Sequence, residues 1–84
     1  MGRSLRTPGH LALMQVLIDS RKAVGLTQQD LADKLERPQS FVAKVETGER
    51  RLDVVEYVEW FLAMGLEPSS GLASIERTFV IVRD

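Results

Sequence analysis

The chain contains no cysteine, a single histidine and no long apolar run among its 84 residues. Without cysteine it forms neither a disulfide framework nor a thiolate metal site, and one histidine does not build a zinc centre. No stretch approaches the roughly 18 apolar residues of a membrane span, and residues 1–6 lack the apolar core of a signal peptide. We therefore expect a cytoplasmic protein that holds no metal and contacts no membrane.

The net charge is −1, but the charges are distributed unevenly along the chain. Residues 1–51 contain nine Lys or Arg and six Asp or Glu, a balance of +3. Residues 52–84 contain two and six, a balance of −4, and the two balances sum to −1. A cationic half can face phosphates while the acidic half points away from them. Taken alone this asymmetry is weak evidence, because soluble domains often show it.

Capping signals divide the first half of the chain into three helices. Thr7 and Pro8 are typical of an N-cap followed by proline at the first helical position. Thr27 and Asp30 match a capping box, and Pro38 interrupts the pattern before a third apolar series. A glycine follows the first and the third series. The predicted helices cover about residues 8–24, 28–35 and 39–47.

The second half predicts two further helices and an ambiguous C-terminus. The apolar run 52–64 also suits a strand, but its length of about a dozen residues and its spacing favour a helix. Pro68 can open a fifth helix that reaches about residue 77. Residues 78–82 are β-branched or aromatic and predict a short strand that pairs with a second subunit. The alternative is that the fifth helix continues through Phe79 to Val82, and both alternatives bury Phe79.

These elements predict one all-α domain over residues 1–84. Its fold is a compact five-helix bundle with a core over about 8–77 and a candidate short C-terminal strand. Residues 78–84 are a candidate dimerisation segment. Trp60, Phe61 and Leu62 are adjacent and cannot all face one small core, so we expect at least one of them to be exposed.

The second and third predicted helices form a helix-turn-helix over about residues 27–47. Ala32 is a small residue where two such helices cross closely. The inner side of the third helix carries apolar residues, so its polar residues face outward. Glutamine matches adenine's major-groove edge, lysine matches guanine's acceptors, and serine is permissive. The candidate base-contacting residues are Gln39, Ser40 and Lys44.

Two segments, 21–32 and 38–50, resemble the Xre family, the Cro and lambdoid-repressor type. The elements GLTQ (25–28), QS (39–40) and E-x-G-x-R (46–50) stand at the spacing typical of that family. The resemblance covers most of residues 17–66 and implies a lambda-repressor-like fold in which the third helix recognises DNA. It implies base contact by Gln39, Ser40 and Lys44, phosphate contact by Gln28, Thr47 and Arg50 or Arg51, and a partly buried ion pair between Arg21 and Glu46.

The sequence departs from the family pattern at two positions. Glu36 stands where the turn usually has glycine, at a place that can require a left-handed backbone. Pro38 replaces the usual Ser or Thr cap of the third helix. We expect Arg37 to offset the negative charge of Glu36 near the DNA.

The resulting hypothesis is a repressor-like transcriptional regulator, encoded by a prokaryote or a phage. It binds double-stranded DNA as a homodimer on a two-fold symmetric operator and needs no cofactor. We find no enzyme signature, because the carboxylates lack His or Cys partners. One alternative is an antitoxin that binds a toxin protein and regulates its own operon. Another is a protein-interaction module that has lost DNA binding, for which the net charge of −1 is the best support.

Overall fold

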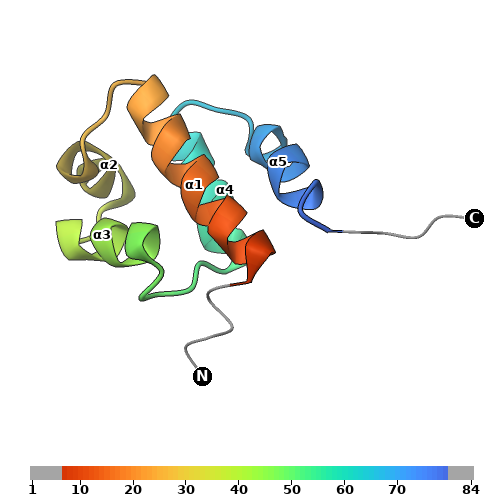
Figure 1. The fold of residues 1–84 in the computed structure, drawn as a ribbon. Coiled ribbons are helices and arrows are strands. Elements are labelled where there is room, and N and C mark those ends of the chain that lie inside the picture. Colours follow the sequence, from red (N-terminus) through yellow and green to blue (C-terminus); the bar gives the residue numbers. More distant parts are fainter. Residues whose placement is uncertain (1–6, 80–84) are drawn as a thin grey trace, which may run out of the picture.

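The computed structural model describes residues 7–79, which fold as a bundle of helices (Figure 1). Helix α1 runs through the middle of the molecule, with α2 and α3 on one side and α5 on the other (Figure 1). Residues 7–79 contain no strand, as expected for an all-α five-helix domain. The elements are α1 (Pro8–Ala23), α2 (Gln28–Leu35), α3 (Gln39–Thr47), α4 (Val54–Ala63), the 3-10 helix η2 (Pro68–Gly71) and α5 (Leu72–Glu76).

The first two helices begin where the capping signals predict. The Thr7 hydroxyl accepts a hydrogen bond from the backbone N–H of His10 at 3.2 Å. At the start of α2, the Thr27 hydroxyl accepts from the Asp30 N–H at 3.0 Å. The Asp30 carboxylate in return accepts from the Thr27 N–H at 2.9 Å, which completes a capping box. These interactions span only three residues, so the sequence alone defines the helix starts.

The turn between α2 and α3 contains a left-handed residue that is not glycine. Glu36 has φ 58° and ψ 44°, as the comparison with the family pattern predicted. Its N–H bonds the carbonyl of Asp33, and the next N–H bonds the carbonyl of Ala32, so both close the end of α2. Arg37, which was expected to offset the charge of Glu36, forms its ion pair with Glu56 of α4, at 3.2 Å.

The apolar run that starts at Leu52 forms a helix, α4, as the sequence analysis favoured, and not a strand. The helix begins two residues after Leu52. Asp53 is its N-cap and accepts from the Glu56 N–H at 2.7 Å. The Glu56 carboxylate accepts from the Asp53 N–H at 3.1 Å. This second capping box fixes the helix start, and Leu52 lies in the preceding loop.

The last predicted helix is split into two short helices. Where one helix was expected over 68–77, η2 is followed by a five-residue α5 that ends at Glu76. The alternative in which this helix continues through Phe79 is therefore wrong. Phe79 is 58% exposed in the single chain, with the edge of its ring resting on Gly9 of α1. Most of the predicted strand, from residue 80 on, lies outside the described residues.

The core gathers where α1, α2, α3 and α4 meet. Trp60 and Phe61 are fully buried, whereas the adjacent Leu62 is 62% exposed, so the expected exposure at this triplet is confirmed. No helix in residues 7–79 is long and apolar enough to cross a bilayer. The fully buried large side chains are Leu17, Leu31, Val42, Val45, Trp60 and Phe61.

Candidate DNA-binding surface

Helix α3 has one buried and one exposed face. Val42, Val45 and Glu46 are buried beneath it, and Phe41 is half-buried at its side. The opposite face is polar and open to solvent, with the half-buried Ala43 as its small member. The exposed residues are Gln39, Ser40, Lys44 and Thr47.

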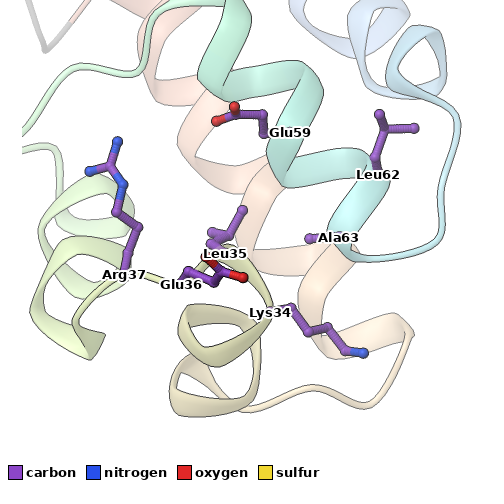
Figure 2. Close-up of a pocket in the computed structure, with 7 residues that line it drawn as sticks. All are labelled: Lys34, Leu35, Glu36, Arg37, Glu59, Leu62 and Ala63. Carbon is purple, nitrogen blue, oxygen red and sulfur yellow. The ribbon is translucent and has the colours of Figure 1, made fainter.

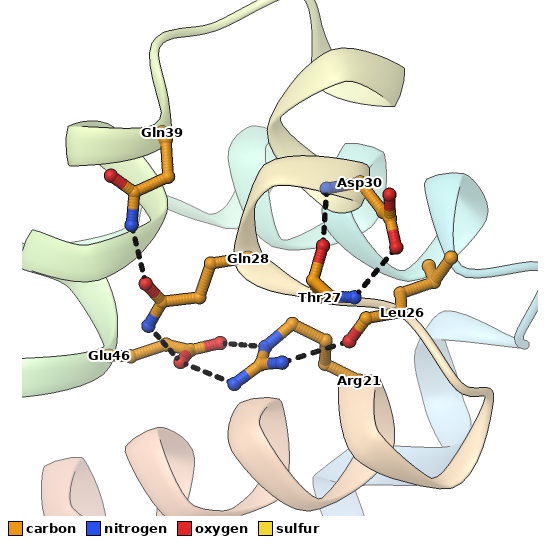
Figure 3. Close-up of polar contacts among 7 residues, drawn as sticks. All are labelled: Arg21, Leu26, Thr27, Gln28, Asp30, Gln39 and Glu46. Carbon is orange, nitrogen blue, oxygen red and sulfur yellow. Dashed lines mark hydrogen bonds and ion pairs between the residues drawn. The ribbon is translucent and has the colours of Figure 1, made fainter.

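A buried ion pair joins α1 to α3 below this exposed face (Figure 3). Arg21 donates from Nε to Glu46 Oε2 at 2.7 Å and from Nη2 to Glu46 Oε1 at 3.0 Å. Its Nη1 donates to the carbonyl of Leu26 at 2.9 Å. The bidentate hydrogen bond to Glu46 raises the pKa of Arg21. The pairing that the family resemblance implied for these two residues is thus present in the fold.

Gln28, at the first position of α2, connects this pair to the exposed face (Figure 3). Its amide nitrogen donates to Glu46 Oε1 at 2.9 Å, and its amide oxygen accepts from Gln39 Nε2 at 2.6 Å. A continuous chain of hydrogen bonds therefore runs from Arg21 to Gln39. Phosphate contact by Gln28 stays a prediction, and the structure adds that its amide holds that of Gln39.

Three further residues of the expected site lie on α3 itself. Lys44 and Ser40 are exposed, and no side chain within residues 7–79 pairs with either of them. The Thr47 hydroxyl bonds the carbonyl of Lys44 at 3.3 Å and the carboxylate of Glu49 at 3.1 Å. The polar atoms of this face are accessible to a ligand that fits along the helix.

Sequence reasoning missed a charged cluster at the edge of α3. Two guanidinium groups lie against the Phe41 ring, that of Arg37 at 4.1 Å and that of Arg50 at 4.8 Å from the ring centroid. Both arginines pair with Glu56, Arg37 at 3.2 Å and Arg50 at 2.8 Å. The hydrogen bond from Arg50 is the main reason that the pKa of Glu56 is lowered.

Of the two arginines expected at phosphates, only Arg50 belongs to this cluster, while Arg51 is exposed in the loop before α4. Arg37 and Glu56 are 19 residues apart, so no local sequence pattern signals their contact. Within residues 7–79, no group of three or more His, Cys, Asp or Glu is placed to hold a metal ion.

Two short helices joined by a tight turn, with the second exposing a polar face, define a helix-turn-helix protein. A family model described as helix-turn-helix matches residues 17–69. Among the solved structures that match is an XRE-family like protein from Pseudomonas syringae pv. tomato str. DC3000. It is 38% identical, the alignment covers 93% of this chain and 95% of that one, and the TM-score is 0.82. A search of curated proteins finds no match.

The chain belongs to the Xre-type helix-turn-helix family, as the sequence resemblance indicated. It is a DNA-binding transcription regulator of that type.

Proposed function

We propose that the protein is a repressor-like regulator that binds a two-fold symmetric operator as a homodimer, with α3 in the major groove. The supporting observation is the face of α3, where Gln39, Ser40 and Lys44 are exposed side by side over a buried inner face. These side chains can read adenine and guanine edges. Occupation of promoter DNA by the dimer then blocks transcription.

The hydrogen-bonded state of Gln39 supports its role as a base reader. An amide group has two N–H donors and one oxygen acceptor, and Gln28 takes only one of the donors of Gln39. The remaining N–H and the oxygen match the acceptor and donor that adenine presents in the major groove. Because its amide is already oriented, Gln39 loses less conformational freedom on binding.

The apolar side of α4 supports a homodimer. Val54, Val55, Val58 and Leu62 are 38–75% exposed along this helix, a continuous apolar stripe that no described element covers. Contiguous exposed apolar surface in a small domain marks an interface. A dimer also sets two recognition helices about 34–36 Å apart, one turn of DNA, and so adds the base contacts that a single module lacks.

The groove beside this stripe is matched in charge to a second copy of itself. It measures about 540 Å³ and lies between the end of α2 and α4, with Lys34 and Arg37 at opposite ends (Figure 2). Two cations, Lys34 and Arg37, are balanced there by two anions, Glu36 and Glu59. A two-fold axis brings the same surface onto itself, so Lys34 of one copy can meet Glu36 or Glu59 of the other, while Arg37 keeps its own partner Glu56.

Selection of bound sequences from random duplex DNA tests this function. We expect an enriched motif with two-fold symmetry, and an affinity that falls steeply with salt concentration because bound phosphates release counterions. A motif without symmetry would contradict the homodimer. Absence of salt-dependent binding to any duplex would favour the alternative of a protein-interaction module.

A further inference from the structure

The cluster of Arg37, Phe41, Arg50 and Glu56 is not part of the face that reads bases, yet it borders that face. Successive helical residues turn by about 100°, so the exposed face of α3 extends from Gln39 at one edge to Lys44 at the other. Phe41 lies just beyond the Lys44 edge. Glu46, bonded to Gln28, lies just beyond the Gln39 edge. Each edge of the recognition helix therefore has its own polar or charged border.

The geometry of B-DNA places each of these two borders beside a phosphate strand. The major groove is about 12 Å wide and has a phosphate strand along each side. A helix seated in it meets one strand at each of its edges. On the Gln28 edge the N-terminus of α2 can meet a phosphate with its backbone N–H groups, whereas the Phe41 edge presents two guanidinium groups.

We propose that Arg37 is a DNA phosphate-contacting residue, which with Arg50 forms a clamp on the strand beside the Phe41 edge, and that Phe41 and Glu56 hold the two guanidinium groups in place. This inference rests on the proposed DNA binding through α3. It adds Arg37, Phe41 and Glu56 to the residues expected from the sequence.

The contacts within the cluster leave donors for a phosphate. The contact of each guanidinium with the Phe41 ring takes up no polar partner, and an arginine has five N–H donors. Arg37 gives one of its nitrogens to Glu56, at 3.2 Å, and its side chain is 40% exposed. Arg50 donates from Nη1 both to Glu56 and to the backbone carbonyl of Arg51, which leaves Nε and Nη2, and its side chain is 41% exposed. Two cations share one carboxylate, so the cluster keeps a net positive charge.

Glu56 is a positioning residue in this arrangement. Its side chain is 12% exposed, and one carboxylate oxygen meets Arg37 while the other meets Arg50. The same residue completes the capping box of α4, so the first turn of this helix fixes the position of the carboxylate that both arginines contact. A guanidinium held in this way loses less side-chain entropy when it binds a phosphate.

The salt dependence of binding measures the clamp directly. For each phosphate neutralised, the slope of log affinity against log salt concentration changes by about 0.9. We expect Arg37→Gln to reduce the magnitude of the slope by about this amount and to weaken binding about tenfold to all duplexes alike, with the selected motif unchanged. The matched control is Arg77→Gln, an exposed arginine just after α5 and away from α3, which should leave the slope unchanged.

Glu56→Gln separates positioning from simple stabilisation. Glutamine still completes the capping box, so α4 should form, but both arginines lose their ionic partner. Removal of a negative charge should strengthen non-specific binding, while loose arginines should add less to the specific complex. We expect the ratio of specific to non-specific affinity to fall severalfold. A lower unfolding midpoint with an unchanged ratio would mean that Glu56 is only structural.

The outcomes distinguish this inference from the proposed function. If Arg37→Gln leaves the slope unchanged while Gln39→Ala alters the selected motif, the clamp is wrong and α3 still reads DNA. If the wild-type protein binds no duplex, both ideas are wrong. Should Arg37→Gln fail to fold, Arg37→Lys carries the test. Because it keeps the charge but loses the planar fork, it should retain the slope and bind severalfold more weakly, and unchanged affinity would overturn the clamp.

Discussion

The carboxylate of Glu46 receives three hydrogen bonds below the recognition helix, two from Arg21 and one from Gln28. Its side chain is only 4% exposed, and that of Arg21 is 10% exposed. A charge in such a place depends on its partner, since water does not replace the lost contacts. The same three bonds anchor α1, α2 and α3 to one another, so one side chain supports the whole motif.

Glu46→Ala should therefore destabilise the fold more than it alters sequence preference. It leaves the Arg21 guanidinium buried without its counterion, at an expected cost of about 3–5 kcal/mol in the free energy of unfolding. Chemical denaturation measures the loss, with Glu67→Ala in an exposed loop as the control. An unchanged denaturation midpoint would show that the pair contributes nothing to the folded state.

Gln28 and Gln39 should behave as a coupled pair in DNA binding. Gln39→Ala should weaken specific binding by about 1–3 kcal/mol and relax preference at one or two base positions in each half-site. Gln28→Ala should relax the same positions less strongly. The double variant should lose less than the sum of the two, because Gln28 acts partly through Gln39.

Gln29→Ala is the matched control for this cycle. Gln29 is the neighbouring glutamine on α2, and its amide bonds Asp33 of the same helix, so its removal should leave the selected motif unchanged. Strict additivity of the Gln28 and Gln39 effects would mean that the hydrogen bond between them has no part in base reading.

Single residues show how far sequence reasoning reaches. The exposure of Gln39, Ser40 and Lys44 follows from helical periodicity, so it could be predicted. Arg37 and Glu56 meet only after the turn before α3 has packed beside α4, and nothing local in the sequence indicates their pairing. The bond that turns Gln28 toward Gln39 also depends on two helices, so Gln28 was assigned to phosphate alone.

At the level of helices, the turn between α2 and α3 stores backbone strain at Glu36. A left-handed conformation costs a residue with a side chain roughly 1–2 kcal/mol, and glycine avoids that cost but loses more entropy on folding. We expect Glu36→Gly to stabilise the protein by about 0.5–1 kcal/mol, seen as a thermal midpoint a few degrees higher. Glu36→Ala keeps the strain and should give no such gain; equal midpoints for both variants would refute this account.

The stability of the fold should depend on pH in the acidic range, because the capping carboxylates Asp30 and Glu56 have lowered pKa values. Backbone hydrogen bonds from Thr27 lower the pKa of Asp30, and Arg50 lowers that of Glu56. A carboxyl whose pKa is lower in the folded state stabilises the fold above its unfolded pKa, and this contribution is lost as the pH falls through its folded pKa. Stability should therefore decline as the pH drops below about 4–5.

Denaturation midpoints measured between neutral and acidic pH test this dependence. Asp30→Asn and Glu56→Gln should each give a shallower decline than the wild type, because each removes one of the two titrating groups. A decline identical in all three proteins would assign the acid sensitivity to other carboxylates.

Helix boundaries were predictable where the signal lay within one turn. The starts of α1 and α2 depend on caps three residues apart, and α3 ends at Thr47, directly before Gly48, which has φ 84°. The start of α4 was predicted two residues too early, at the apolar Leu52. The capping box of Asp53 and Glu56 marks the true start. No capping signal in the sequence marks the boundary between η2 and α5. Close packing occurs at this boundary, because an added Cβ at Gly71 would come within 3 Å of Phe61, Tyr57 and Val16.

At the level of the whole molecule, the proposed dimer places the apolar stripe of α4 against a second copy. Leu62→Asp puts a charge into that contact, so we expect sedimentation equilibrium to show a shift toward monomer with the helical content unchanged. Operator affinity should fall with it, since one recognition helix makes too few contacts. Leu11→Asp, at an exposed leucine of α1, is the control. A Leu62→Asp protein that remains fully dimeric would move the interface elsewhere, and truncation of residues 78–84 would then test the C-terminal segment.

The position of Trp60 gives the molecule an optical reporter of its own. It is the only tryptophan in the sequence and is fully buried, so all indole fluorescence comes from one site in the core. Its ring centroid lies 5.7 Å from that of Phe41, which belongs to the recognition helix. Emission from the unlabelled protein is therefore sensitive both to unfolding and to how α3 sits on the core, and a titration with DNA can follow that helix without any added dye.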